Sequence, residues 1–350
     1  MTVTPVGRAV TVLGARRLDV RSLPPVPAGT SDAVVDVAYG GICGSDLHYW
    51  QSGEVGESVL VDPMVLGHEV VGIVRVAASD GSGPPAGTPV AVHPADTCGR
   101  CDFCLAGRDN LCPHLRYLGS AARRPHTDGG FADRLLVPGH RLVPVPEGLD
   151  LRTAALAEPA SVAAHALARA EALADGVRGR HVLVTGAGPI GLLVVALAGI
   201  AGAASVTATD LHDRPLRTAL RVGATAVVKA GEQLPAADVA FESSGAAQAL
   251  AVALGALRPG GTLIQVGQLP GAGVTAPVHL AVGRELVLSG SSRFAGGMAP
   301  VLDVIARHRD LFTPIVTAEY PVEQVEEAMK AAREPAESSK VLLRFDSTIH

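Results

Sequence analysis

The apolar positions of the first 150 residues come in short runs that are typical of β-strands. Runs rich in β-branched residues stand between proline and glycine turns, and three of them read AVVDVAYG, VVGIVRV and TPVAVHP. Valine, isoleucine and threonine favour extended chain, and the turn residues between the runs interrupt any helix. The pattern therefore predicts an irregular all-β domain over residues 1 to about 150.

The pattern changes at about residue 155, where alanine and leucine become frequent and strand-like runs alternate with helix-like runs. The strand-like runs read HVLVTG, SVTATD, DVAFESSG and TLIQVG. Such alternation is typical of parallel βαβ units with crossover helices. We expect a parallel sheet whose last strand lies near 286–289, and a tail from about 290 that packs back on the first domain.

The composition and the charge are those of an ordinary globular protein. The chain has 350 residues, of which 48% are hydrophobic and 18% charged, and its net charge is −5 with a pI near 6.2. No segment is dominated by lysine or arginine, which argues against nucleic acid or an anionic membrane as a partner. The N-terminus lacks the pattern of a secretory signal and no apolar run is long enough to span a bilayer, so a cytoplasmic location is expected.

Four of the five cysteines are clustered at a spacing typical of metal ligands. The segment CGRCDFCLAGRDNLC places two, two and seven residues between Cys98, Cys101, Cys104 and Cys112. Four thiolates complete a tetrahedral shell around zinc and leave no open position, so the cluster predicts a structural zinc site. An iron–sulfur cluster or unliganded thiols are the alternatives. A reducing cytosol favours thiolate ligands over disulfides.

A glycine-rich turn follows the strand-like run HVLVT and precedes a long apolar helical run. Its sequence GAGPIG has the G-x-G-x-x-G pattern, which allows a tight turn, the approach of a pyrophosphate and close packing of helix on strand. Asp210 ends the next strand-like run, where a carboxylate can bind the adenosine ribose and disfavour a 2′-phosphate. The turn predicts a site for NAD, with NADP as an alternative because His212 and Arg214 follow Asp210; a turn without a ligand is the other interpretation. The site residues are Gly186, Gly188, Pro189, Ile190, Gly191 and Asp210.

A second set of metal-ligating side chains is dispersed along the chain. Cys43 lies in GICGSDLH, His68 and Glu69 lie in LGHEVVG, and Glu158 lies in LAEPASV. One thiolate, one imidazole and one carboxylate would leave the fourth position of a zinc ion for water or an alcohol oxygen. Taken singly, each residue also fits a structural role, as a small buried cysteine, a core histidine or a charge at a helix N-terminus. These residues alone leave both interpretations open.

An ordered series of motifs carries a resemblance that favours the catalytic interpretation. The chain contains GGICGSDLHYW, VLGHEVVG, CGRCDFCLAGRDNLC, DGGFADRL, AEPASVAAHA, GAGPIGLL and GSSRF. Over nearly its whole length it resembles the zinc-dependent medium-chain alcohol dehydrogenase family, and within it the sorbitol dehydrogenase group. The resemblance implies a GroES-like catalytic domain of residues 1–154 and 290–350, with a Rossmann NAD-binding domain of residues 155–289 between them. It also implies a homo-oligomer, either a dimer or a tetramer.

The same resemblance implies two zinc ions per chain and the ligands of the catalytic one. Cys43, His68 and Glu158 match its ligands, and Glu69 is the carboxylate that some members use as a ligand or as an exchange partner. Asp46 matches a residue that orients His68, because a ligating imidazole needs its other N–H fixed.

Resemblance to the family further implies the reaction. Zinc lowers the pKa of the substrate hydroxyl, and hydride passes from the carbinol carbon to NAD+. Ser45 and His48 match the proton relay of the family, with Ser45 accepting the hydroxyl proton and His48 releasing it at the solvent edge.

The substrate implied by the resemblance is a polyol or an aldonic acid, with L-idonate favoured over sorbitol, xylitol and L-threonine. A substrate carboxylate calls for a guanidinium, and Arg293 in GSSRF is the leading residue. We expect Tyr49 and Glu158 to contact substrate hydroxyls. Weaker substrate-side residues, which also fit a solvated loop, are Arg116, Arg123, Arg124 and His126.

Two functions from other classes compete with a dehydrogenase. A non-catalytic dinucleotide-binding protein would keep the fold, but the retained set of cysteine, serine, histidine and glutamate at the zinc argues against it. A zinc-ribbon interaction module would explain only the cysteine cluster, and the chain has no basic face for nucleic acid.

Overall fold

The β-branched runs of the first part of the chain and of its tail form one ten-stranded sheet in the computed structural model, which describes residues 3–345. The main path of this sheet is β12-β8-β7-β3-β11-β1-β2, and neighbours along it are antiparallel. The strands are β1 (Thr4–Gly14), β2 (Arg17–Leu23), β3 (Asp32–Gly41), β6 (Met64–Val65), β7 (Glu69–Val76), β8 (Pro89–Val92), β11 (Ala132–Pro138), β12 (Leu142–Pro144), β19 (Val316–Pro321) and β20 (Lys340–Arg344).

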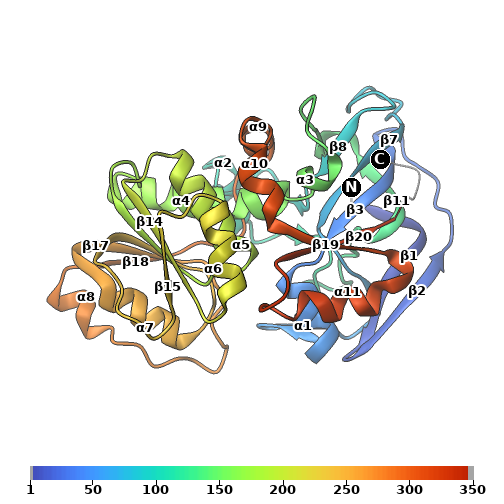
Figure 1. Cartoon of the computed structure of the whole chain (residues 1–350). Coiled ribbons are helices and arrows are strands. Elements are labelled where there is room, and N and C mark those ends of the chain that lie inside the picture. Colours follow the sequence, from blue (N-terminus) through green and yellow to red (C-terminus); the bar gives the residue numbers. More distant parts are fainter. Residues whose placement is uncertain (1–2, 346–350) are drawn as a thin grey trace.

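The C-terminal tail is built into this first sheet. β19 and β20 pair in parallel with each other, and β20 pairs antiparallel with the end of β3, where Leu342 lies opposite Gly41. Figure 1 shows these red strands beside the blue strands of the N-terminal part. Strand β20 therefore lies next to the end of β3, just before Cys43.

The alternating part of the chain forms a six-stranded parallel sheet in the order β15-β14-β13-β16-β17-β18. This is the strand order of the Rossmann fold, so the predicted doubly wound sheet is confirmed. The order reverses between β13 and β16, and ligands of such sheets bind at the carboxyl ends of the strands at this point. The strands are β13 (His181–Thr185), β14 (Ser205–Asp210), β15 (Ala226–Lys229), β16 (Ala237–Glu242), β17 (Leu257–Gln265) and β18 (Val287–Gly290).

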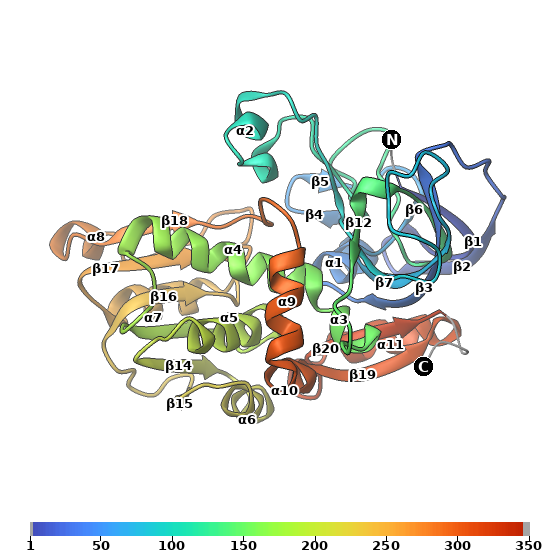
Figure 2. The same ribbon diagram turned by 90° about the horizontal axis from the view of Figure 1, so that it is seen from above.

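Helices cover the parallel sheet and connect it to the first sheet. Helix α4 packs against α5 and β17 and also reaches β7 and α9, so it bridges the two halves (Figure 2). The helices are α1 (Gly44–Ser52), α2 (Asp102–Leu105), α3 (Leu151–Ala154), α4 (Ala157–Ala174), α5 (Pro189–Ile200), α6 (Asp213–Arg221), α7 (Ala247–Ala256), α8 (His279–Gly283), α9 (Ala299–Arg307), α10 (Arg309–Phe312) and α11 (Val325–Ala332).

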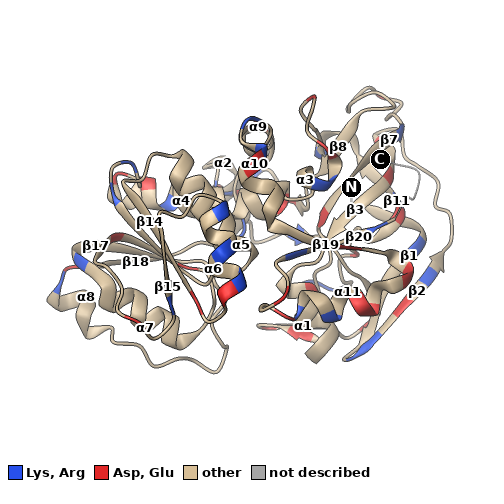
Figure 3. Cartoon of the chain, in the orientation of Figure 1, with Lys and Arg blue, Asp and Glu red and all other residues tan. Residues whose placement is uncertain are grey.

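Short elements complete the chain. They are the strands β4 (Glu54–Val55), β5 (Ser58–Val59), β9 (Ala95–Asp96) and β10 (Arg116–Tyr117) and the 3-10 turns η1 (Asp109–Leu111), η2 (Gly139–Arg141), η3 (Thr313–Ile315) and η4 (Val322–Gln324). Among the described residues, no helix has the length and apolar character needed to cross a bilayer. Lys and Arg are interspersed with Asp and Glu over both halves in Figure 3. The domain boundaries at 154/155 and 289/290 stay predictions.

Candidate active site

The pairing of two strands assembles the first group of metal-ligating side chains. Gly41 at the end of β3 lies opposite Glu69 at the start of β7, so Cys43 and His68, which flank this pair, are brought together. One ligand atom from each of Cys43, His68 and Glu69 lies within 4.8 Å of the others. The thiol, imidazole and carboxylate are the donor types that zinc prefers, so the group fits a zinc ion.

Asp46 fixes the two chain segments that carry these ligands. It is fully buried on the first turn of α1, and its carboxylate accepts from the backbone N–H groups of Cys43 at 2.9 Å and Gly67 at 3.0 Å. Burial raises the pKa of Asp46, and the charge of His68 opposes this. Asp46 therefore ties the residue before His68 to the residue before α1.

Glu69 is bound on its other side by a buried lysine that sequence reasoning missed. The Lys340 ammonium, at the start of β20, lies 2.6 Å from both carboxylate oxygens of Glu69 and donates to the Ile42 carbonyl at 3.0 Å. The side chains are 2% and 1% exposed. Burial acts to lower the pKa of Lys340, but the charge and hydrogen bond of Glu69, together with the charges of Cys43 and Glu158, outweigh it, so the pKa is raised. A lone lysine in the tail segment SSKVLLR carries no metal-site pattern, which is why the sequence did not reveal it.

Glu158 lies beside this group and is held by a tyrosine. The Tyr117 hydroxyl donates to a Glu158 carboxylate oxygen at 2.5 Å, and Tyr117 packs edge-on against His68 with ring centroids 5.6 Å apart. The charge of Glu158 acts to raise the pKa of both His68 and Glu69, although Glu158 is not part of the compact group of Cys43, His68 and Glu69. Tyr117, which sequence reasoning also missed, has its pKa raised well above its ordinary value by burial and then by Glu158.

Arg293 reaches the same place from the segment after β18. Its guanidinium carbon lies 5.2 Å from the centre of the Tyr117 ring, an arrangement that suits a cation–π contact. Its backbone φ is +52°, in the left-handed region that non-glycine residues rarely adopt. Among the described residues no acceptor pairs with the guanidinium, so its donors are free for a ligand.

The other residues predicted on α1 lie at different depths. Ser45 is half-buried and His48 is exposed, one helical turn further along. Tyr49 is only 2% exposed, it packs in the core of the first sheet, and its hydroxyl accepts from the Ala121 N–H at 2.9 Å. The substrate contact predicted for Tyr49 stays a prediction.

The four weaker substrate-side residues lie in β10 and in the loop that follows it, and they mostly bond within this segment or to a neighbouring one. Arg116 donates to the Pro125 carbonyl at 3.0 Å, and Arg123 donates to the carbonyls of Leu115 and Pro113. The His126 ring accepts from the Val61 N–H at 3.0 Å. Arg124 is exposed and precedes a cis proline, Pro125. These contacts agree with a loop-holding role.

The cysteine cluster forms a small lobe around α2 and η1. Its sulfur atoms are 3.5 Å apart for Cys101 and Cys104, 3.6 Å for Cys98 and Cys112, and 4.0 Å for Cys98 and Cys104. Zn–S bonds of about 2.3 Å in a tetrahedron place sulfurs about 3.8 Å apart, so the four thiols fit one zinc ion. All four sulfurs lie within 4.8 Å of one another, which leaves no room for several iron atoms between them.

The glycine-rich turn has the geometry that a dinucleotide needs. Gly186 has φ +86°, and a Cβ there would meet Ser244 at 2.7 Å. Gly188 caps α5 and faces open space, which leaves its backbone free for a phosphate, and Pro189 takes the first helical position. A Cβ at Gly191 would lie 1.8 Å from the Gly186 carbonyl oxygen. Ile190 is half-buried behind the turn.

Two carboxylates organise the strand ends around this turn. Asp210 accepts from the Ala187 N–H at 2.8 Å and from the His212 N–H at 2.9 Å. Glu242, which sequence reasoning missed, is fully buried at the end of β16, next to the point where the strand order reverses. It accepts from the backbone of Ser244 at 2.8 Å and from the backbone of Gly245. Glu242 also accepts from the side chains of Ser244, Gln265 and Thr185.

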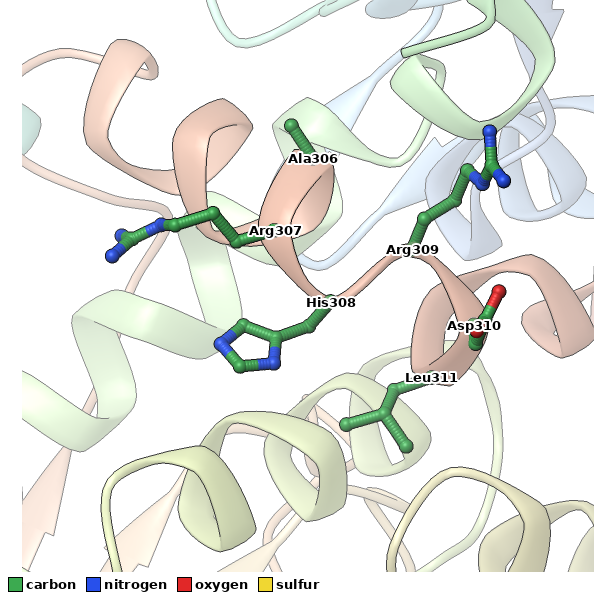
Figure 4. A pocket seen from close by; sticks show the side chains of 6 residues that line it. All are labelled: Ala306, Arg307, His308, Arg309, Asp310 and Leu311. Carbon is green, nitrogen blue, oxygen red and sulfur yellow. The ribbon is translucent and has the colours of Figure 1, made fainter. Parts of the chain in front are cut away.

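A surface hollow of about 370 Å³ at the junction of α9 and α10 contains none of these groups. It is lined by residues 306–311, and the side chains of Arg307 and Arg309 point in opposite directions from it (Figure 4).

Comparison with known families agrees with this site. Residues 29–147 match the family described as Alcohol dehydrogenase GroES-like domain, and residues 189–307 match that described as Zinc-binding dehydrogenase. The chain is 37% identical over 320 residues to L-idonate 5-dehydrogenase (NAD(P)(+)) of Escherichia coli (strain K12), covering 89% of this chain and 91% of that protein. It is 32% identical over 336 residues to sorbitol dehydrogenase of Bacillus subtilis (strain 168), covering 93% of each.

Solved structures give the same result. The crystal structure of L-idonate 5-dehydrogenase from Escherichia coli str. K-12 substr. MG1655 matches with a TM-score of 0.90 and 33% identity, over 98% of this chain and 100% of that chain. A putative zinc-binding dehydrogenase from Sinorhizobium meliloti 1021 bound to NADP matches with a TM-score of 0.85 and 30% identity, over 96% and 98%. The predicted enzyme class, with zinc and a nicotinamide dinucleotide as cofactors, is thereby confirmed. The chain belongs to the zinc-dependent medium-chain alcohol dehydrogenase family, among its polyol and aldonate dehydrogenases.

Proposed function

We propose that the chain is an L-idonate 5-dehydrogenase, which oxidises L-idonate to 5-keto-D-gluconate with NAD+ or NADP+. The observation that carries this proposal is the unpaired guanidinium of Arg293, which lies over Tyr117 beside the group of Cys43, His68 and Glu69. A guanidinium without an acidic partner favours a substrate that carries a carboxylate. The identity to an L-idonate 5-dehydrogenase supports the same substrate.

Cys43, His68 and Glu69 would hold the catalytic zinc at rest, since their ligand atoms already lie together. When bound, zinc supplies Lewis-acid activation of the substrate hydroxyl. Glu158, fixed by Tyr117, would contact a substrate hydroxyl and serve as the exchange carboxylate. Cys98, Cys101, Cys104 and Cys112 would hold the second, structural zinc.

Ser45 and His48 would carry the proton away from the substrate. They lie three residues apart on α1 and so on one face of the helix, with Ser45 half-buried and His48 exposed. Proton transfer of this kind contributes about 10²-fold or more to a rate. The kcat of His48→Ala should therefore fall at neutral pH and recover at alkaline pH, and an unchanged kcat would remove His48 from the relay.

Zinc quantification tests the metal assignments. We expect about two zinc ions per chain, one of which is lost in Cys43→Ser together with all turnover. Glu69→Gln should lose catalytic zinc, whereas Glu158→Gln should keep it. Full turnover in Cys43→Ser would refute the mechanism.

A comparison of four substrates tests the assignment of L-idonate as the substrate. Reduction of NAD+ and of NADP+ should be followed with L-idonate, sorbitol, xylitol and L-threonine. Arg293→Ala should raise the KM for L-idonate far more than that for sorbitol, and Arg221→Ala, at the exposed end of α6, serves as the matched control. A wild-type protein that uses sorbitol much better than L-idonate would make it a polyol dehydrogenase instead.

The predicted homo-oligomer would pair through β18. This strand is the edge of the parallel sheet, and its Val287 and Leu288 are 36% and 41% exposed. An unpaired apolar edge favours pairing with another copy. Light scattering of Leu288→Lys should report a smaller assembly than wild type or than the control Val59→Lys, and identical masses for all three would refute this interface.

A further inference from the structure

The cysteine lobe is connected to the segment that carries Arg293. Asn110, in η1 two residues before Cys112, is 8% exposed, and its side-chain amide donates to the Ser292 carbonyl at 2.9 Å. Its neighbour Asp109 accepts from the Gly296 N–H at 3.1 Å. Two adjacent side chains of the lobe thus hold both ends of the short segment 292–296, with Arg293 between them.

Residues next to strands of both sheets also hold this segment. The His93 ring, just after β8, bonds to the Gly296 carbonyl at 3.2 Å and packs edge-on against Phe294 at 5.2 Å. The Ser291 N–H donates to the Gln265 carbonyl at the end of β17 at 2.9 Å. The backbone around Arg293 is therefore fixed by neighbours from three parts of the chain.

The left-handed backbone of Arg293 requires that its neighbours hold the chain in place. A left-handed φ is unfavourable for an arginine and persists only where the surroundings determine it. The same conformation directs the guanidinium over the Tyr117 ring. Without the bond from Asn110, the Ser292 carbonyl would lose the partner that holds the peptide just before Arg293.

We propose that Asn110 and Asp109 are positioning residues for Arg293, so that the cysteine lobe takes part in the recognition of the substrate carboxylate. This inference rests on the proposed function, because it assigns Arg293 the substrate carboxylate. The four thiols fix η1 through Cys112, and η1 fixes the segment 292–296. The cysteine lobe thereby increases the affinity for the substrate by holding Arg293 in position, although the lobe itself does not contact the substrate.

A double-mutant cycle tests this role. Asn110→Ala should raise the KM for L-idonate about tenfold, because the variant loses one hydrogen bond and leaves the Ser292 carbonyl without its donor. The kcat should change much less. The KM for sorbitol should change little. Because Asn110 acts through Arg293, the double variant Asn110→Ala/Arg293→Ala should bind L-idonate no more weakly than Arg293→Ala alone. Asp102→Asn, on the exposed face of the lobe, is the matched control.

Two measurements besides turnover complete the test. Zinc content should stay at the wild-type value in Asn110→Ala, and the Kd of L-idonate for the enzyme–NADH complex, followed by NADH fluorescence, should rise in parallel with KM. Additive effects in the cycle, or an equal loss on L-idonate and sorbitol, would overturn the positioning role. If Arg293→Ala itself leaves L-idonate binding unchanged, the proposed substrate contact fails instead, so the two failures are distinguishable.

Discussion

Removal of the Lys340 ammonium should destabilise the protein strongly. In Lys340→Met the Glu69 carboxylate loses both 2.6 Å contacts, and the Ile42 carbonyl loses its donor. Both side chains of the pair are at most 2% exposed, so water cannot replace the ammonium without rearrangement. A Cβ at Gly41 would lie 2.1 Å from a Glu69 oxygen, so backbone already occupies another side of the carboxylate.

The cost follows from the unpaired charge. Breaking a buried ion pair by removing one partner costs about 3–5 kcal/mol, because the remaining charge stays buried. For domains of 150–250 residues each kcal/mol corresponds to about 2–4 °C, so the apparent Tm should fall by about 6–20 °C. Replacing both partners should recover most of this loss, since no unpaired charge remains.

Thermal unfolding of wild type, Lys340→Met and Lys340→Met/Glu69→Leu measures the effect at one pH, with all three proteins held in chelator so that no zinc ion neutralises Glu69. Lys330→Met is the matched control, because Lys330 is exposed on α11 and its ion pair with Glu326, at 3.9 Å, is exposed as well. A fall in the apparent Tm of less than about 2 °C in Lys340→Met would refute the reasoning, since it would mean that the buried Glu69 side chain is not stabilised by the Lys340 ammonium.

Three further perturbations test other parts of the structure. Burial lowers the pKa of His93 below its ordinary value of 6.5, so the His93 side chain binds a proton more readily in the unfolded chain than in the folded one. The neutral His93 therefore contributes fully to the free energy of unfolding above about pH 6.5, and this contribution is lost as the pH falls towards the folded-state pKa. In urea unfolding, the free energy of unfolding should accordingly fall less between pH 7.5 and 5.5 for His93→Gln than for wild type. An equal fall in both proteins would contradict this expectation. Glu242→Ala should raise the Kd of NADH at least about tenfold, because it leaves the N–H groups of Ser244 and Gly245 without acceptors, while zinc content stays unchanged. Gly191→Ala should abolish NADH binding measured by fluorescence, since its Cβ would overlap the Gly186 carbonyl, whereas Gly255→Ala, with open space around it, should bind normally.

Much of the fold could be predicted because local pattern and tertiary structure agree. The strand predicted near 286–289 is β18. Strand β15 was not predicted: it has four residues, lies at the sheet edge and is half-exposed, so its apolar pattern is weak.

The site was predictable where residue type and spacing define the chemistry. The cysteine spacing and the glycine-rich turn predict their sites by themselves, and the ligands around Cys43 are named by resemblance. Tyr117, Lys340 and Glu242 were missed because each has a partner that is distant in the sequence and that only the fold brings close. Arg293 was predicted, but its contact with Tyr117 and its left-handed backbone became visible only in the structure.

The position of β20 has a consequence for the synthesis of the protein. Lys340, which neutralises the Glu69 carboxylate beside Cys43 and His68, begins β20, 271 residues after Glu69, so it leaves the ribosome much later than they do. Domains of a growing chain fold as units, with the N-terminal part first. Here the N-terminal sheet must wait for almost the whole chain before its last strand is added and its buried charge is paired. A translation product that stops short of β20 would therefore carry the zinc-ligand residues of the first sheet without the cation that makes their burial stable.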